Sequence, residues 1–383
     1  MKILPYKVLM AFITCLLLGG CVSGDTVQQA GEVDSGCWAE VLAPVLGDLD
    51  VQIGGIAAVS GDDIWAVGQQ TNTEGGSRTV TMHWGGERWA AVPSPNVSEG
   101  GESKNQLYAV AASAANEVWA VGAYTEGTGN FRNLAMRWNG QAWELRLPPS
   151  PGLLENGLNG VGLIDGFEVW AVGTALSDEG KDPQMVIFRW DGSAWAQSKS
   201  PEHSSHNLLA VKALSKNDVW AAGTDVIRWD GREWQQVPTP VDHPGGYLDG
   251  VAATGPNDVW VTGNDGNEAI AVHWDGARWS GGNTPKLGDG PFPHDIASLA
   301  PDDIWIAGEY SDDPAYSLPM LLRWDGQEWH AIANPIPGRA ARLQSLTVAD
   351  GVLWAAGTQQ DATGTRPLLL RRTAGPCADA EDG

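Results

Sequence analysis

Basic side chains are scarce in this sequence. Lysine and arginine together number 23, against 47 aspartates and glutamates, and the net charge is −24. A surface this acidic repels phosphate backbones and anionic headgroups. The charge balance therefore excludes nucleic acid as a partner. Solubility explains the excess of acidic side chains, and cation binding is the more specific alternative.

Helical periodicity and the common catalytic signatures are absent as well. No segment sustains apolar residues at helical spacing, and 49 glycines and 23 prolines interrupt the chain too often for long helices. The sequence contains no Gly-x-Ser-x-Gly, no phosphate-cradling glycine-rich loop and no His-Glu-x-x-His. These absences favour a β-rich binding protein over an enzyme, and they predict no cofactor.

The apolar run Val8 to Leu18 is too short for a permanent membrane span, and Lys2 and Lys7 precede it. It ends in Leu-Gly-Gly-Cys21. This box resembles the bacterial lipoprotein signal, which implies cleavage before Cys21 and lipid, including palmitate, on Cys21. Val22 resembles an outer-membrane sorting residue, for a source with two membranes. We therefore expect an extracytoplasmic protein that touches the membrane through its lipid anchor only.

The rest of the chain divides by composition and repeats. Residues 1–20 form the expected signal peptide, and residues 21–35, rich in Ser, Gly, Gln and acids, form a flexible tether. Residues 36–377 form one repeat domain, and residues 378–383 form a disordered tail. Loss of residues 1–20 leaves 21 basic and 47 acidic side chains, a net charge of −26.

One hexapeptide recurs seven times in the repeat domain. Six copies have the form (Asp/Glu)-(Ile/Val)-Trp-x-x-Gly, and successive tryptophans of the hexapeptide lie 40 to 54 residues apart. The copies begin at Asp63, Glu117, Glu168, Asp218, Asp258, Asp303 and Val352. A period of this length is typical of propeller and solenoid repeats.

A second element, (Arg/His)-Trp-(Asp/Asn/Gly)-Gly-x-x-Trp, follows each of the first six hexapeptides. Asp-Gly or Asn-Gly between apolar runs predicts a β-hairpin, because both turn residues tolerate positive φ. The tryptophans of these elements are Trp84 and Trp89, Trp138 and Trp143, Trp190 and Trp195, Trp229 and Trp234, Trp274 and Trp279, and Trp324 and Trp329. Each repeat thus predicts four short strands, which we name a to d, with the hexapeptide as strand b. Seven such repeats predict an all-β, seven-bladed β-propeller of four-stranded antiparallel blades.

The ends of the chain predict how the ring closes. The seventh repeat ends after its third strand, at Leu368–Arg372, and the missing fourth strand is supplied by Gly36–Pro44 at the other end. Such pairing completes the last blade and removes exposed sheet edges. Cys37 and Cys377 fall where the other blades have their Asp-Gly turn, so we expect a disulfide between them.

All twenty tryptophans occupy three positions of the repeat. A large aromatic side chain at a fixed position in every blade predicts blade-to-blade packing, with some strand-d tryptophans as candidates for exposure. The Arg or His before the first hairpin tryptophan is expected to stack on the rings or to pair beside them. Together, the two motifs resemble the tryptophan-rich propeller repeats of bacterial exported proteins. The architecture is similar to kelch and Asp-box propellers, but the kelch Gly-Gly pair and the Asp-box order are missing, so neither activity is implied.

Function is expected on the face that carries the b–c and d–a loops, because these vary between repeats. Candidate ligand-binding residues are Tyr310, Asp312, Asp313 and Tyr316 in the expected b–c loop Glu309–Pro319, and His243 and His294, which we expect in d–a loops. The sequence favours a monomeric binding or scaffold propeller that presents acidic loops to a protein or glycan.

Two alternatives stay open. A carbohydrate-binding, lectin-like propeller would use rim tryptophans, with equivalent sites in several blades. A metal-assisted lyase or hydrolase would use His203, His206, His243 and His294, with Asp242, Asp249, Asp289 and Asp295 near them in the sequence. This second alternative includes a bound metal ion.

Overall fold

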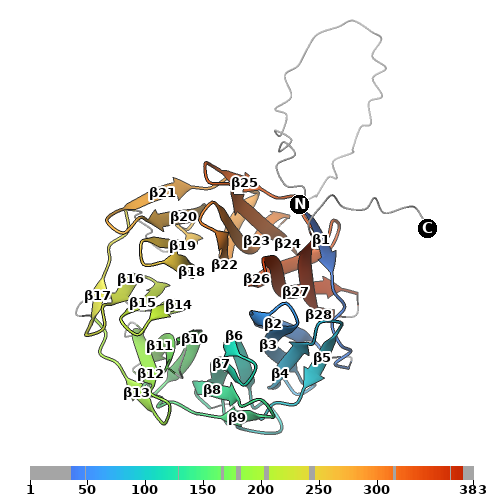
Figure 1. The fold of residues 1–383 in the computed structure, drawn as a ribbon. Helices are drawn as coiled ribbons and strands as arrows, with labels where there is room; N and C mark the ends of the chain where they lie inside the picture. The colour runs from blue at the N-terminus through green and yellow to red at the C-terminus, as the bar shows by residue number, and fades with distance from the viewer. Residues whose placement is uncertain are drawn as a thin grey trace, which may run out of the picture. The chain divides into compact units, whose positions relative to one another are not determined.

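The computed structural model describes residues 36–373, apart from residues 48, 128, 165–167, 178–182, 202–206, 241–245, 314–315 and 363. These residues form seven four-stranded antiparallel sheets arranged as the blades of a ring (Figure 1). The predicted seven-bladed β-propeller is confirmed. The expected signal peptide, tether and tail lie outside the described residues. No helix among the described residues is long and apolar enough to cross a membrane.

The strands follow one another from the axis outward in each of the first six blades. Blades 1 to 3 contain β2 (Val51–Ser60), β3 (Asp63–Thr71), β4 (Ser77–Trp84) and β5 (Trp89–Val92); β6 (Asn105–Ala114), β7 (Glu117–Tyr124), β8 (Arg132–Trp138) and β9 (Trp143–Leu145); and β10 (Glu155–Ile164), β11 (Glu168–Leu176), β12 (Gln184–Trp190) and β13 (Trp195–Gln197). Blades 4 to 6 contain β14 (Leu208–Ser215), β15 (Asp218–Gly223), β16 (Val226–Trp229) and β17 (Trp234–Gln236); β18 (Leu248–Gly255), β19 (Asp258–Asn264), β20 (Ala269–Trp274) and β21 (Trp279–Asn283); and β22 (Asp289–Ala300), β23 (Asp303–Asp313), β24 (Tyr316–Trp324) and β25 (Trp329–Ala331).

Blade 7 joins the two ends of the repeat domain. It contains β26 (Ala340–Ala349), β27 (Val352–Asp361) and β28 (Gly364–Thr373), and its outer strand is β1 (Cys37–Glu40) from the N-terminal side. β1 pairs antiparallel with β28, with Cys37 opposite Thr373 (Figure 1). The predicted closure by the N-terminal strand is confirmed. Cys377 lies outside the described residues, so its disulfide with Cys37 stays a prediction.

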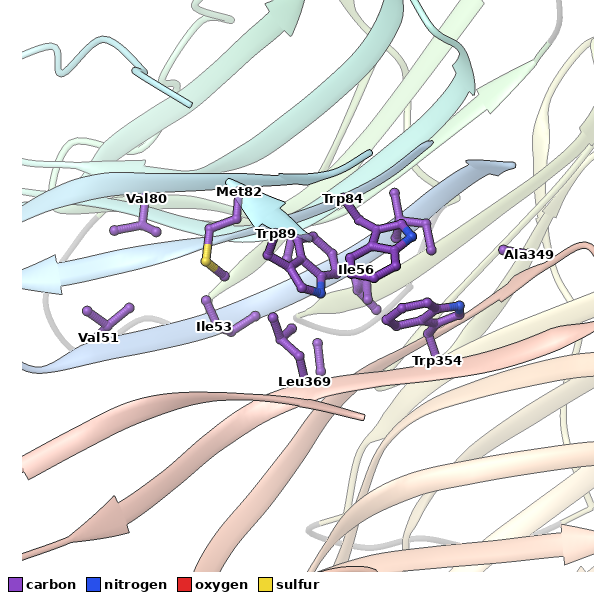
Figure 2. Packing of buried hydrophobic residues seen from close by; sticks show 13 residues of the cluster. Val51, Ile53, Ile56, Val80, Met82, Trp84, Trp89, Ala349, Trp354 and Leu369 are labelled. Carbon is purple, nitrogen blue, oxygen red and sulfur yellow. The ribbon is translucent and has the colours of Figure 1, made fainter. Parts of the chain in front are cut away.

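The tryptophans pack between blades, as the repeat predicted. Each strand-b tryptophan packs against tryptophans of the next blade, two at six interfaces and Trp38 alone at the seventh, with ring centroids 4.8–6.1 Å apart. Figure 2 shows the interface that closes the ring, where Trp354 of blade 7 lies against Trp84 and Trp89 of blade 1. Blade 7 lacks a strand-c tryptophan, and there the guanidinium of Arg372 lies over Trp305, 4.9 Å from the ring centroid. Twelve of the twenty tryptophans are buried, and the other eight, including the strand-d residues Trp38, Trp195, Trp279 and Trp329, are partly exposed.

The acid that begins the hexapeptide pairs with the cation that precedes the hairpin tryptophan. In blade 2, Glu117 accepts hydrogen bonds from Trp119 Nε1 (2.6 Å) and Arg137 Nε (2.9 Å). Equivalent pairs occur in the other five complete repeats: Asp63–His83, Glu168–Arg189, Asp218–Arg228, Asp258–His273 and Asp303–Arg323. Both predicted roles of the cation are confirmed, because Arg228 also lies over Trp220, 4.9 Å from the ring centroid.

The glycine that ends the hexapeptide is required by a β-bulge in strand a. Every strand a shifts its register against strand b by one residue, opposite this glycine. The shift brings a strand-a carbonyl close to the glycine Cα: a Cβ on Gly68 would lie 1.9 Å from Gln52 O, and the other six sites give 1.9–2.1 Å. A side chain therefore has no room at this position.

Candidate functional site

The seven bulges place seven different residues around the central channel. The extra residue of strand a in successive blades is Gly54, Tyr108, Asn159, Leu209, Asp249, His294 and Gln344. All seven line one cavity of about 530 Å³. We call them the bulge ring. The flanking positions of strand a are small or aliphatic in most blades, so the bulge ring carries most of the chemical variety of the channel wall.

Asp249 is the member of the bulge ring whose pKa is shifted toward neutrality. Burial in the channel wall raises the pKa of its carboxyl to about 6, and the nearby His294 opposes this rise. A carboxyl with a pKa near neutrality is able to donate or accept a proton at physiological pH. From the sequence, Asp249 was a candidate only because it lies near the four histidines of the expected metal site.

His294 is held by a carboxylate from the next strand. Its Nε2 lies 3.2 Å from Glu309 Oε1. This hydrogen bond is the main cause that holds the pKa of Glu309 below its ordinary value, with Ser317 and Arg342 acting in the same direction and burial opposing. Because an ionised carboxylate only accepts hydrogen bonds, Nε2 carries the proton.

A second pair of ionisable side chains, Asp295 and Lys212, lines the same cavity. Asp295 accepts hydrogen bonds from Ser345 Oγ (2.9 Å) and Leu346 N (2.8 Å) of blade 7, but burial still raises its pKa above the ordinary value. The side chain of Lys212 is accessible to water in the channel, but protein atoms lie close around it. This partial desolvation lowers the pKa of Lys212, and the charge of Asp295 opposes the shift. The channel wall therefore contains both an acidic and a basic side chain.

A smaller pocket lies on the loop side of blade 6. It has a volume of about 350 Å³ and is lined by Asp289, Gly290, Phe292, Glu309, Tyr310, Ser311, Asp312 and Ser317. We call it the blade 6 pocket. Glu309 belongs to this pocket while its partner His294 belongs to the bulge ring, so the hydrogen bond between them connects the two sites.

The predicted ligand residues fall on or beside these two sites. Tyr310 and Asp312 line the blade 6 pocket, and burial raises the pKa of Tyr310 with help from the charge of Asp312. Tyr316 opens β24 and is 46% exposed. Asp313 ends β23, opposite Tyr316. These residues were expected in a loop, but most of Glu309–Pro319 is a hairpin of β23 and β24, because β23 pairs with β22 and β24 on both sides.

Of the four histidines expected to form a metal site, only His294 is among the described residues. His203, His206 and His243 lie outside the described residues. The expectation that His294 lies in a d–a loop is wrong: it lies within β22, because strand a of blade 6 begins early, at Asp289, to pair with the long β23. No group of three His, Cys, Asp or Glu side chains among the described residues is arranged to hold a metal ion.

Several candidate residues were missed in the sequence. Tyr108, Asn159, Gln344 and Phe292 carry no motif of their own. An alignment of the seven strands a would have revealed the first three, because they stand between an apolar residue and a small one in each repeat. Such an alignment would not reveal the β-bulge, and it is the bulge that turns this position toward the axis.

Comparison with known proteins adds fold neighbours. The structure is similar to "YCF48 bound to D1 peptide", with a TM-score of 0.55 and 14% identity, over 91% of this chain and 100% of that one. YCF48 from Cyanidioschyzon merolae gives 0.54 and 14%, over 88% and 98%. A Trypanosoma rangeli sialidase mutant that displays trans-sialidase activity gives 0.51 and 11%, over 87% of this chain and 58% of the sialidase.

These neighbours share the fold. At identities this low, the similarity carries the propeller architecture and no activity. No protein-family model matches the sequence, and no curated protein matches it either.

The raised pKa of Asp249 predicts how stability depends on pH. The folded state holds this proton more tightly than the unfolded chain, so Asp249 lowers the free energy of unfolding as the pH rises from about 4 to about 6. Asp249→Asn is expected to remove this loss and to stabilise the protein at pH 7.5 by about 2–3 kcal/mol, since one pKa unit corresponds to ~1.4 kcal/mol. Urea unfolding of both proteins at pH 4 and pH 7.5 measures the difference. Equal stability differences at the two pH values would contradict the assignment.

Proposed function

We propose that this protein is a lipid-anchored, extracytoplasmic propeller that binds an extended segment of another protein at the loop face around the channel mouth. The observation that carries the proposal is the bulge ring. Blade packing repeats the same residue types seven times, whereas the bulge position holds a different residue type in every blade. A scaffold alone has no need for this asymmetry, but recognition of one ligand in one orientation requires it.

Two further observations support a protein ligand. The blade 6 pocket adjoins the ring through His294 and Glu309, so a bound chain is able to contact both sites. A structure with a similar fold is described as bound to a peptide. The lectin alternative has less support, because the tryptophans that would stack on sugars also pack against neighbouring blades and none is more than partly exposed.

The binding test compares peptides with glycans. The purified protein is probed on an array of random 15-residue peptides and on a glycan array, beside the double variant Tyr108→Ala/His294→Ala. Glu87→Gln, an exposed residue on the opposite face, is the control. We expect peptide signals that the double variant loses and the control keeps. Signals on glycans alone, or peptide signals that the ring variant leaves unchanged, would overturn the proposal.

A second candidate function is acid–base catalysis at the axis. It is favoured by one observation: Asp249, with a pKa of about 6, feels the charge of His294, which is itself hydrogen-bonded to Glu309. The metal content of the purified protein and of its His203/206/243/294→Ala variant tests the metal-assisted form. About one equivalent of a transition metal that is lost in the variant would favour the enzyme.

The lipid anchor predicts a labelling result. Cys21 is the expected acceptor, so growth with a radiolabelled or clickable palmitate should label the protein, and Cys21→Ala should abolish the label while Cys37→Ala keeps it. The label would appear in the membrane fraction. Persistent labelling of Cys21→Ala would remove the anchor from the proposal.

The closing disulfide predicts a redox effect on stability. β1 is a four-residue strand, so its hold on β28 is expected to depend on a covalent link between Cys37 and Cys377. Reduction, or the Cys37→Ser/Cys377→Ser variant, should destabilise the protein by about 2–5 kcal/mol. Thiol titration of the denatured, exported protein measures the link directly. Two titratable thiols at these positions before reduction would refute it.

A further inference from the structure

The exposed aromatic side chains of the described residues gather at blades 5 and 6. They are Tyr247, Phe292 and Tyr316, which are 45%, 47% and 46% exposed. Tyr247 precedes β18, Phe292 lies on β22 and Tyr316 opens β24. All three therefore lie on segments near the loop face. Exposed aromatic rings grouped at one place mark a binding surface.

The strand lengths explain why blade 6 presents such a surface. Its inner three strands contain 12, 11 and 9 residues, against 8, 7 and 6 in blade 5. Both blades have the same tight turn from strand a to strand b, between Ala300 and Asp303 and between Gly255 and Asp258. The extra length is therefore added on the loop side, where the blade 6 hairpin extends beyond that of its neighbour.

The blade 6 pocket combines aromatic and acidic groups. Phe292 and Tyr310 supply rings, and Asp289, Glu309 and Asp312 supply carboxyl groups. Gly288 brings the preceding loop against this wall: a Cβ there would lie 2.6 Å from Asp312 Oδ1 and 2.7 Å from Tyr310 Cδ2. The pocket is therefore a formed cavity beside aromatic rings.

The charges of this pocket are unevenly compensated from within the protein. Glu309 is bonded to His294 and feels the charge of Arg342. The pocket lining contains no lysine, arginine or histidine that would compensate the negative charges of Asp289 and Asp312. The nearby Lys286 lies 4.0 Å from Glu268 instead.

We propose that the blade 6 pocket receives a lysine or arginine side chain of the bound segment, an inference that rests on the proposed function. A cation over Phe292 or Tyr310 gains from the ring quadrupole, and Asp289 and Asp312 supply the opposite charge. An anionic side chain would be repelled, and an aliphatic one would desolvate the carboxylates without compensation. The net charge of −24 also steers cationic segments toward the protein.

The direct test uses small probes. N-acetyl-arginine methylamide and its uncharged citrulline counterpart are titrated into the protein at low salt, with saturation-transfer NMR as the readout. We expect the arginine probe to bind about tenfold more tightly, from the sum of cation–π and charge contributions. Added salt should reduce the difference, because the charges are exposed. Equal affinities of the two probes would overturn the inference.

Two variants locate the binding. Asp312→Asn and Phe292→Ala change exposed side chains and should leave the fold intact, which thermal unfolding verifies. Each should reduce the arginine preference to about threefold or less. Glu87→Gln makes the same charge change as Asp312→Asn on the opposite face and should keep the preference. An unchanged preference in Asp312→Asn and Phe292→Ala would also overturn the inference.

The outcomes separate this inference from the proposed function. Peptides that depend on Tyr108 and His294 but not on Asp312 would refute the cation pocket and leave peptide binding in place. An arginine probe that binds at the pocket, with no peptide signal on the array, would support the pocket and refute the proposed function.

Discussion

Replacing Gly68 with alanine is expected to destabilise the protein more than most single substitutions. The new Cβ would lie 1.9 Å from Gln52 O, a backbone atom of the neighbouring strand, and 2.9 Å from Ile53 Cα. Neither atom belongs to a flexible side chain, so β2 must move away from β3 to make room. We expect a loss of about 3 kcal/mol or more, at the upper end of the range for overpacked cores.

A matched control lies in the same blade. Gly85 stands in the turn between β4 and β5, and a Cβ there meets nothing within 4 Å. Gly85→Ala should therefore change the stability by less than about 0.5 kcal/mol. Denaturant unfolding of the three proteins measures both effects. Similar stabilities of Gly68→Ala and Gly85→Ala would mean that the bulge is not required for the fold.

Truncation of Trp170 is expected to have a comparable effect for a different reason. Its ring is fully buried between blades 3 and 4. The ring centroid lies 5.2 Å from that of Trp229 and 5.3 Å from that of Trp234. Its Nε1 donates a hydrogen bond to Glu168, which also pairs with Arg189. Trp170→Ala opens a cavity at the blade interface and leaves Glu168 with one partner fewer. We expect a loss of about 3–5 kcal/mol.

Two companions separate packing from the hydrogen bond. Trp170→Phe keeps a ring at the interface but loses Nε1, so it should recover more than half of the lost stability. Leu153→Ala removes a side chain that is 74% exposed and should be nearly neutral. Thermal unfolding ranks the four proteins. If Trp170→Ala were as stable as Leu153→Ala, the tryptophan network would not hold the blades together.

The sequence alone predicted some residues of the blade 6 pocket and missed others. Tyr310, Asp312, Asp313 and Tyr316 were selected because acids and aromatics stand together in a variable segment, and two of them do line the blade 6 pocket. Phe292 was not selected, because a single phenylalanine beside two prolines has no pattern. Glu309 was part of the segment, but its bond to His294 depends on the pairing of β22 with β23.

The seven blades, the hairpin turns, the tryptophan interfaces and the closure by β1 were all predictable from the sequence. The physical reason is repetition: each blade solves the same packing problem with the same residues at the same spacing, so a pattern too weak to interpret once becomes clear when it occurs seven times. In all six Asp-Gly, Asn-Gly or Gly-Gly turns, the glycine at the second turn position has a φ between 91° and 97°.

The bulge ring was decided by the tertiary structure alone. Tyr108, Asp249 and His294 are about 45 to 190 residues apart in the chain and share no motif, but ring closure brings them to one cavity. A one-residue shift of register turns a strand position from a packed interface toward the axis, and no local preference of the residue itself signals that shift. The sequence by itself therefore determined the frame, whose contacts repeat, and the closed ring determined which non-repeating side chains meet, since their proximity exists only once all seven blades are in place.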